Sequence, residues 1–375
     1  MFTSEKTKQV KGIAILLMLM HHLYFFTDRI PYGMSVATNI YFSGKELTQI
    51  LGDFGKFCVP LYMFLGGYGL YIKLSSIKEG QEYGKNSLVS HYIKLYSAYW
   101  KVFLIFIPIG FLFFNNQSQY CNEAAICNRF ANYSLQAVIL EFVGIRSSIA
   151  SEWWFLLTYL FALFIGFVFW ELFKKNRKIY SELAVVIIWY ILTTDVFTMM
   201  PWIEGYESMG NNPWFYNLCM NGQYSVFFLL GMILAKYKIY DTWNRLLSKL
   251  KKIEKILVSM FMLIMIVDMY VFLYVPAYVM ILIPLFVFAC AIFIEETVVF
   301  KKVLKVLGNH STNMWLIHGF YCYYFEPIAK FVYSSNNAII SLLIFVLLTL
   351  GSSYLVNIIW KIIGMGYTRI REKVA

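Results

Sequence analysis

Charged residues are scarce in this sequence. Only 14% of its 375 residues are Asp, Glu, Lys or Arg, whereas a soluble domain has about 25%. Hydrophobic residues make up 60% of the chain, and long apolar runs recur at intervals that suit bilayer crossings of about 20 residues. This composition excludes a soluble globular protein and predicts an all-α integral membrane protein that is membrane domain for almost its whole length.

Several motifs of well-known enzyme classes are also missing. The sequence has no Walker loop, no GxGxxG that opens a helix and no GxSxG elbow, so ATPase, dinucleotide-dependent and serine-hydrolase functions lack the residues that would carry them. No Cys and His cluster has metal-ligand spacing, and we predict neither a metal site nor a permanently bound cofactor. No cleavage site closes the first apolar run, which we therefore expect to stay as the first span.

Hydropathy predicts about ten transmembrane helices in a single domain over residues 1–375. An even number of crossings puts the two termini on the same side of the membrane. The predicted spans are residues 12–28, 53–72, 92–114, 153–173, 180–200, 217–235, 256–275, 277–297, 303–325 and 338–361.

Positive charge is distributed unevenly over the predicted loops. Most of the 32 Lys and Arg residues lie in alternate loops on the side of the N-terminus, which predicts that both termini are cytoplasmic. This placement accounts for the net charge of +11 without a nucleic-acid partner and makes membrane lipids with anionic head groups the expected partners. Six cations fall on the predicted outer side: Arg29, Lys45, Lys56, Arg129, Arg146 and Lys330.

The predicted outer loops differ from the basic inner ones. Residues 115–133 are rich in Asn and Gln, and residues 201–216 mix acids, Asn and aromatic side chains. Such surfaces suit sugars, although Trp and Tyr at these places also fit an interfacial belt. Residues 134–149 are too short to cross a membrane, so we expect an outer-leaflet or re-entrant helix.

Two of the six cysteines lie in one predicted outer loop. Cys121 and Cys127 have five residues between them, where oxidation to a disulfide and two free thiols are both open alternatives. The other four cysteines lie in or beside predicted spans as small apolar residues.

Ionisable groups inside predicted spans are few and are candidates for function. The chain has five histidines, and His22 lies eleven residues after Lys11. Eleven positions at about 100° each give three turns plus about 20°, so both lie on one helix face about 16 Å apart along the axis. His21 points about 80° away. A neutral His22 could act as general base, while Lys11 could bind phosphate or only reach the lipid head groups.

The ninth predicted span begins with polar residues. Asn309 or Ser311 could cap a helix whose N–H groups bind an anion such as pyrophosphate. Capping does not explain His318 in mid-span, which is a second catalytic candidate beside His22 and His21. At the outer end of the fourth span, Glu152 and Trp154 are candidates for binding an acceptor.

Four stretches together resemble acyltransferase family 3 membrane proteins, which O-acylate surface carbohydrates. The family's first-span signature is Arg, ten residues and His; here Lys11 replaces the Arg and His22 matches. The stretch VPLYMFLGGYGLY (59–71) is similar to VPxFFxxSGY, with glycines that suit close helix packing or ligand access. The stretches WWFLLTYLF (153–161) and LGNHSTNMWLIH (307–318) are similar to the WFL and LGxxSxxxYLxH segments.

The resemblance implies a membrane O-acetyltransferase of the bacterial plasma membrane. Acetyl-CoA or another acyl-CoA would be the donor, held by Lys11, Asn309 and Ser311. A carbohydrate or glycolipid would be the acceptor, as in the standalone fucose 4-O-acetylase-like group. The alternative is a transporter or flippase of a glycan, lipid-linked sugar or organic anion, with histidines that couple protons. The sequence leaves open whether the protein is a monomer or a homo-oligomer.

Overall fold

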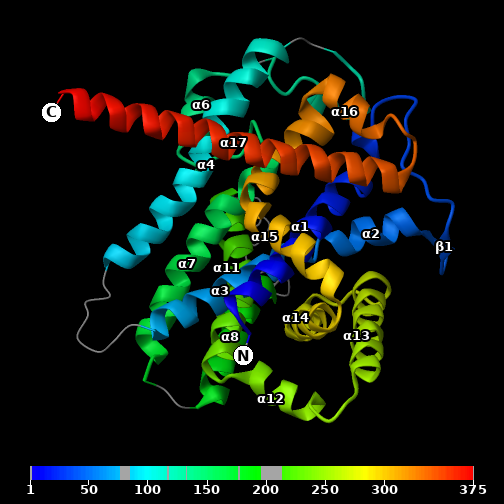
Figure 1. The fold of residues 1–375 in the computed structure, drawn as a ribbon, viewed down its shortest axis with the longest axis vertical. Coiled ribbons are helices and arrows are strands. Elements are labelled where there is room, and N and C mark those ends of the chain that lie inside the picture. The colour runs from blue at the N-terminus through cyan, green and yellow to red at the C-terminus, as the bar shows by residue number, and fades with distance from the viewer. Residues whose placement is uncertain are drawn as a thin grey trace, which may run out of the picture. The chain divides into compact units, whose positions relative to one another are not determined.

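The protein is almost entirely helical in its computed structural model, which describes residues 2–76, 85–115, 118–131, 133–175, 178–195 and 213–374 (Figure 1). The longer helices are α1 (Ser4–Tyr24), α2 (Leu47–Gly55), α3 (Cys58–Ser75), α4 (Lys85–Phe113), α7 (Trp154–Phe173), α8 (Ile179–Tyr190), α11 (Pro213–Lys236), α12 (Ile239–Leu247), α13 (Lys252–Phe272), α14 (Val279–Glu296), α15 (Val298–Gly319) and α17 (Ala338–Val374). The shorter elements are η1 (Thr27–Arg29), α5 (Ala124–Cys127), α6 (Leu135–Phe142), η2 (Ser151–Trp153), η3 (Ile191–Asp195), η4 (Pro276–Tyr278), η5 (Phe320–Tyr324) and α16 (Glu326–Tyr333). Strands β1 (Tyr41–Phe42) and β2 (Lys45–Glu46) form one antiparallel hairpin. The all-α prediction is confirmed.

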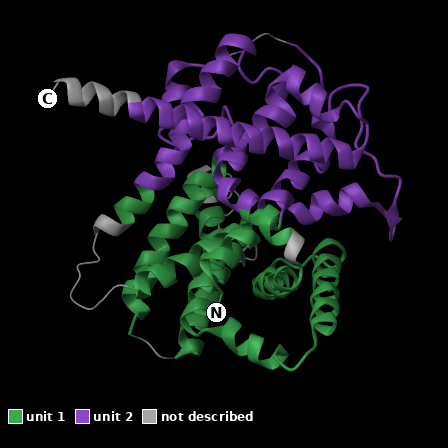
Figure 2. Cartoon of the chain, viewed as in Figure 1, with its two compact units in different colours: residues 1–14, 57–92, 154–305 green, residues 15–56, 93–153, 306–375 purple. Residues whose placement is uncertain are grey.

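The chain forms two compact units, drawn in different colours in Figure 2. Unit 1 comprises residues 1–14, 57–92 and 154–305, and unit 2 comprises residues 15–56, 93–153 and 306–375. Helices α1, α4 and α15 each begin in unit 1 and end in unit 2. Residues far apart in the sequence therefore build each unit.

Unit 1 is organised around the packing of α11 against α3. The glycines of the 59–71 stretch make this approach close, because a Cβ on Gly67 would overlap the Phe228 carbonyl and one on Gly66 would lie 2.7 Å from the Tyr159 hydroxyl. A Cβ on Gly69 would meet nothing within 4 Å. Close helix packing is thus confirmed at Gly66 and Gly67, in agreement with small residues at membrane-helix interfaces.

Seven helical segments in the described residues are long and apolar enough to cross a membrane. They match seven of the ten predicted spans: Leu47–Ser75, Leu88–Phe113, Ser151–Phe173, Asn217–Lys236, Lys252–Phe272, Pro276–Glu296 and Ala338–Met365. The other three predicted spans correspond to α1, to the shorter apolar helix Ile179–Thr194 and to α15. A count of ten crossings and the cytoplasmic termini stay predictions.

The structure corrects the predicted start of the ninth span. Asn309 and Ser311 do not cap a helix, since α15 already begins at Val298 and runs through both. Asn309 is exposed, while Ser311 is buried and donates its hydroxyl to the Gly308 carbonyl (3.0 Å). Inside a helix the backbone N–H groups bond within the helix, so no N-terminal anion site exists at these residues.

Two predicted outer segments have different outcomes. Residues 134–149 contain the short helix α6, which Ser134 caps by accepting from the Ala137 N–H (3.2 Å). Eight residues cannot span a membrane, as predicted. Residues 201–212 of the predicted loop 201–216 lie outside the described residues.

Candidate functional site

The end of α1 places two neighbouring histidines on different partners. The Nδ1 atom of His21 lies 2.8 Å from the Gly52 carbonyl oxygen of α2. His22 points elsewhere, toward His318 of α15, and the two ring centres lie 4.4 Å apart at an interplanar angle of 58°. Adjacent positions on a helix differ by about 100°, which is why only one of the pair can face α15.

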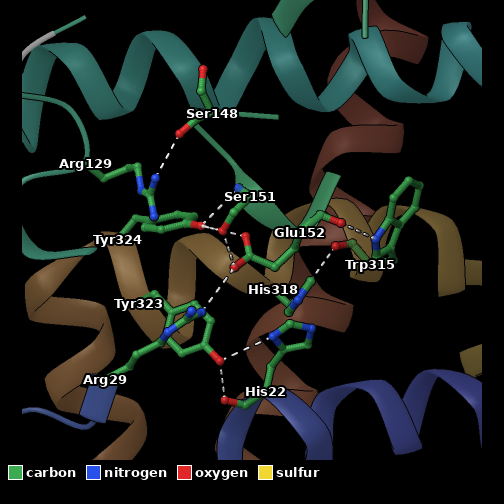
Figure 3. Close-up of polar contacts among 10 residues, drawn as sticks. All are labelled: His22, Arg29, Arg129, Ser148, Ser151, Glu152, Trp315, His318, Tyr323 and Tyr324. Atoms are coloured by element: carbon green, nitrogen blue, oxygen red, sulfur yellow. Dashed lines mark hydrogen bonds and ion pairs between the residues drawn. The ribbon is translucent and has the colours of Figure 1, made fainter. Parts of the chain in front are cut away.

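The hydrogen bonds of His22 identify its protonated ring nitrogen. The Tyr323 hydroxyl donates its single proton to the His22 carbonyl oxygen (2.5 Å), and the same hydroxyl oxygen lies 3.3 Å from His22 Nδ1 (Figure 3). Because the hydroxyl proton is already used, the second contact needs a proton on Nδ1. Neutral His22 therefore keeps the lone pair on Nε2.

His318 has the same arrangement with a different acceptor. Its Nδ1 atom contacts the Trp315 carbonyl oxygen, which can only accept, so Nδ1 carries the proton. His318 is fully buried, and its Nε2 atom has no hydrogen-bond partner among the residues that the structure describes. A buried acceptor without a partner costs about 1–3 kcal/mol, and the lone pair of this nitrogen is available to accept a hydrogen bond.

A buried carboxylate, that of Glu152, lies close to the histidine pair (Figure 3). Glu152 is 6% exposed, and its oxygens accept from the Tyr324 hydroxyl (2.6 Å) and the Ser151 hydroxyl (3.1 Å). Arg29 Nη1 is 3.8 Å from the same carboxylate. A buried carboxylate needs such partners to stay charged. Its position also depends on Gly319, where a Cβ would lie 2.7 Å from Glu152 Oε2.

Arg29 links the carboxylate to the tyrosine beside His22. Its guanidinium carbon lies 4.0 Å from the Phe26 ring centre and 4.9 Å from the Tyr323 ring centre. These are cation–π distances. Arg29 therefore stacks on the ring whose hydroxyl orients His22, while its Nε atom is buried without a partner in the described structure.

Two tryptophans join the Glu152 segment to α15. The Trp153 indole donates to the Leu316 carbonyl (3.0 Å), and the Trp315 indole donates to the Glu152 carbonyl (3.2 Å). His318 in turn donates to the carbonyl of Trp315. The backbone at Glu152 and the orientation of His318 are thus fixed by one set of bonds (Figure 3).

The loop before Glu152 is held by a second buried carboxylate. Glu141 is fully buried and accepts from the backbone N–H groups of Ser148 (2.6 Å), Ile149 (3.1 Å) and Ala150 (3.1 Å). Burial raises the pKa of Glu141 to about 6, against the opposing effect of these N–H donors. Arg129 Nη1 donates to the Ser148 carbonyl (2.8 Å) of the same loop.

Comparison with known families decides what kind of protein carries this site. Residues 8–358 match the family model described as an acyltransferase domain, Acyl_transf_3. The chain belongs to acyltransferase family 3. No curated protein and no solved structure matches it. With its apolar helices, this family 3 member is a multi-pass membrane acyltransferase.

Some of the residues predicted to form the acyltransferase site come together in unit 2. These are His22, His318 and Glu152, with His21 next to them. His310 is separate, since its Nδ1 atom contacts the Ser353 hydroxyl of α17 (2.8 Å). The catalytic assignments stay predictions.

Of the other four predicted residues, two belong to unit 1 and two to unit 2. Lys11 and Trp154 belong to unit 1, where Trp154 packs on Phe155 and Tyr224. Asn309 and Ser311 belong to unit 2, inside α15. Roles in donor or acceptor binding remain predictions for all four. Among the described residues, no group of three or more His, Cys, Asp or Glu side chains is placed to hold a metal ion.

Three residues of the candidate site could not be predicted from the sequence. The sequence predicts Arg29 only as an outer cation, and it gives no role to Tyr323 or Tyr324. The two tyrosines lie in the π-turn η5, where the Phe325 N–H bonds to the Phe320 carbonyl five residues earlier (2.9 Å). Such turns are frequent at functional sites, but a regular helical wheel does not place their side chains. The available signal was the aromatic run FYCYYF directly after His318.

Proposed function

We propose that this membrane acyltransferase moves an acetyl group from acetyl-CoA to a hydroxyl of a carbohydrate or glycolipid at the bacterial plasma membrane. One observation carries the chemistry. The two imidazoles of His22 and His318 lie side by side, and each uses Nδ1 on a protein oxygen, so that both Nε2 lone pairs remain. General base catalysis of acyl transfer to a hydroxyl needs such a lone pair.

His22 is the proposed general base. As the acceptor oxygen attacks the thioester carbonyl carbon, its proton passes to His22 Nε2. The C–S bond then breaks, and the leaving CoA sulfur takes that proton from the imidazolium. Tyr323 holds His22 Nδ1 during both steps, which keeps the ring orientation and the tautomer constant.

Transient acylation of His22 itself is the other form of the same proposal.

His318 is assigned a supporting role. Its buried Nε2 can accept a hydrogen bond from the acceptor hydroxyl or take part in transfer of the hydroxyl proton. Lys11 is the proposed contact for CoA phosphates, because it takes the place of the Arg in the family's first-span signature. The fucose 4-O-acetylase-like resemblance supports a glycan or glycolipid as the acceptor.

The test measures label transfer by purified protein in detergent or nanodiscs. Radiolabelled acetyl-CoA is incubated with a polysaccharide and glycolipid fraction of the cell envelope, and a series of longer acyl-CoA donors tests the acyl group. His22→Gln should lower turnover by about 10²- to 10⁴-fold, the usual contribution of a general base.

His310→Gln is the matched control, since His310 lies on α15 but contacts Ser353 and not His22. It should retain near wild-type turnover, and both variants should match the wild type in size-exclusion and thermal unfolding profiles. Unchanged transfer by His22→Gln would remove the mechanism. Absence of any acyl transfer, with glycan movement into protein-containing vesicles, would instead favour the transporter alternative.

A further inference from the structure

A pair of thiols lies in the segment between α4 and α6. The Sγ atoms of Cys121 and Cys127 are 2.8 Å apart, and both residues are buried, with exposures of 0% and 5%. The one-turn helix α5 brings them together, because the Cys127 N–H bonds to the Glu123 carbonyl (3.2 Å) and Cys127 Sγ reaches the Cys121 carbonyl (3.7 Å). The backbone is therefore already arranged for a bond between the sulfurs.

We propose that Cys121 and Cys127 form a disulfide in the native protein, on the oxidising side of the membrane. Each thiol gives up one proton and one electron. The acceptor is the disulfide of a thiol–disulfide oxidant, which leaves as two thiols. The side of the membrane follows from the charge distribution, which predicts residues 115–133 opposite the basic cytoplasmic loops.

The contacts of the loop give this disulfide a role beyond the loop. Tyr120 donates its hydroxyl to the Tyr323 carbonyl and accepts at its own carbonyl from the Tyr32 N–H (2.8 Å). The Asn122 N–H bonds to the Asp28 carbonyl (3.0 Å). The residues around Cys121 thus hold both the segment that carries Arg29 and the π-turn that carries Tyr323.

A covalent link at Cys121 restrains this loop in its bonded conformation. Burial raises the pKa of the Cys121 thiol to about 12, so in the folded protein this sulfur is protonated and unreactive toward exchange. The bond should therefore form before the loop packs, and because both cysteines are buried it should resist external reductants until the protein unfolds.

The four other cysteines provide an internal control. Cys58, Cys219, Cys290 and Cys322 all lie in helices, and no contact between any two of their sulfurs is present among the described residues. Oxidation that is specific to Cys121 and Cys127 should leave these four cysteines as free thiols.

Mass spectrometry of the full-length protein from membranes tests the bond directly. Free thiols are alkylated with N-ethylmaleimide in denaturant at harvest, and chymotrypsin then cleaves after Tyr120 and Phe130. The expected peptide, residues 121–130, contains both cysteines without label and is lighter by two hydrogens, whereas the other four cysteines are alkylated. Full alkylation of Cys121 and Cys127 would overturn the proposal.

A double variant tests the consequence for the site. Cys121→Ser with Cys127→Ser should lower the thermal midpoint by a few degrees and lower acyl transfer by up to about 100-fold through misplacement of Tyr323. Cys290→Ser in α14 is the control and should change neither the alkylation of the pair nor acyl transfer. A disulfide that is present while the double variant keeps full stability and activity would overturn the bracing role.

The activity arm of this test depends on the proposed function, whereas the peptide mass does not. Failure of acyl transfer in the wild type would therefore leave the disulfide assignment standing.

Discussion

At the scale of single residues, the proposed chemistry depends on which ring nitrogen of each histidine carries the proton. Tyr323 decides this for His22, and the Trp315 carbonyl decides it for His318. Both assignments follow from donor and acceptor counting. The lone pairs on Nε2 are therefore a consequence of neighbours and not of the histidines themselves.

Tyr323→Phe tests the orientation of His22. The variant removes the hydroxyl that contacts His22 Nδ1, so the ring can adopt the wrong tautomer, and we expect kcat for acyl transfer to fall by about 10- to 100-fold with little change in KM. Tyr333→Phe is the control, since this buried hydroxyl bonds to the neighbouring Leu23 carbonyl (3.4 Å) and not to His22. Equal losses in the two variants would mean that Tyr323 has only a structural role.

Glu141 should make stability depend on pH. Its pKa is raised from 4.5 to about 6 in the folded protein, so the folded state binds more protons than the unfolded state between these values. The contribution of Glu141 to the free energy of unfolding should then fall by up to about 2 kcal/mol as pH rises from 4.5 to 6, and this contribution should be constant above that range.

Denaturant titrations in detergent at several pH values measure this contribution. Glu141→Gln lacks the titrating group, and the difference between wild type and variant isolates its effect from those of other carboxylates. Parallel pH profiles of the two proteins would contradict the assignment. The free energy difference between wild type and variant should therefore change by up to about 2 kcal/mol between pH 4.5 and 6.

At the scale of elements, helix ends and irregular turns position the site, while regular helices supply the framework. His22 lies in the last turn of α1, Glu152 in the 3₁₀ turn η2, and Tyr323 in the π-turn η5. Regular helices, in contrast, pack through periodic contacts. The glycines of α3 show that some of these contacts leave no room for a Cβ atom.

Gly67→Ala and Gly69→Ala form a matched pair on α3. The first places a methyl group against the Phe228 carbonyl and should lower the free energy of unfolding by about 1–3 kcal/mol or more. The second meets nothing within 4 Å and should be neutral or stabilising by up to about 1 kcal/mol, because Ala favours helix over Gly. Thermal unfolding of both variants measures these changes in stability. An equal change in the two variants would argue against close packing of α3 on α11.

At the scale of the whole molecule, the number of crossings determines which loops share a side. Five of the ten predicted spans lie between the β1–β2 hairpin and the α12–α13 loop, but only four of the seven candidate spans do. The segment Ile179–Thr194 makes the difference.

Epitope insertions distinguish the two counts. We expect a tag between Ser43 and Gly44 to be accessible on intact spheroplasts and a tag after Lys249 to need permeabilised membranes, as five crossings and the positive-inside rule require. Both sites are exposed turns. Accessibility of both tags from one side would show that Ile179–Thr194 does not cross.

Much of the framework could be predicted from the sequence, because hydropathy and charge act locally along a chain. Seven predicted spans match candidate spans, and the glycines of 59–71 indicated close packing. The predicted start of α15 was wrong because its first turns carry Lys301, Lys302 and Lys305. A cluster of lysines beside a span is typical of a loop, but here the lysines lie within the helix. The partners of His22 could not be predicted, since Tyr323 lies 301 positions away in sequence.

The sequence by itself determined an all-helical membrane acyltransferase of family 3 and the separation of His22 from its neighbour His21. These properties depend on composition, helical spacing and the order of motifs, all of which are set along the chain. Only the tertiary structure decided that His22 faces His318, that Arg29 and Tyr324 hold Glu152, and that two cysteines meet beside the site. Those contacts depend on where helices end and how turns redirect the backbone, and packing between distant segments sets both.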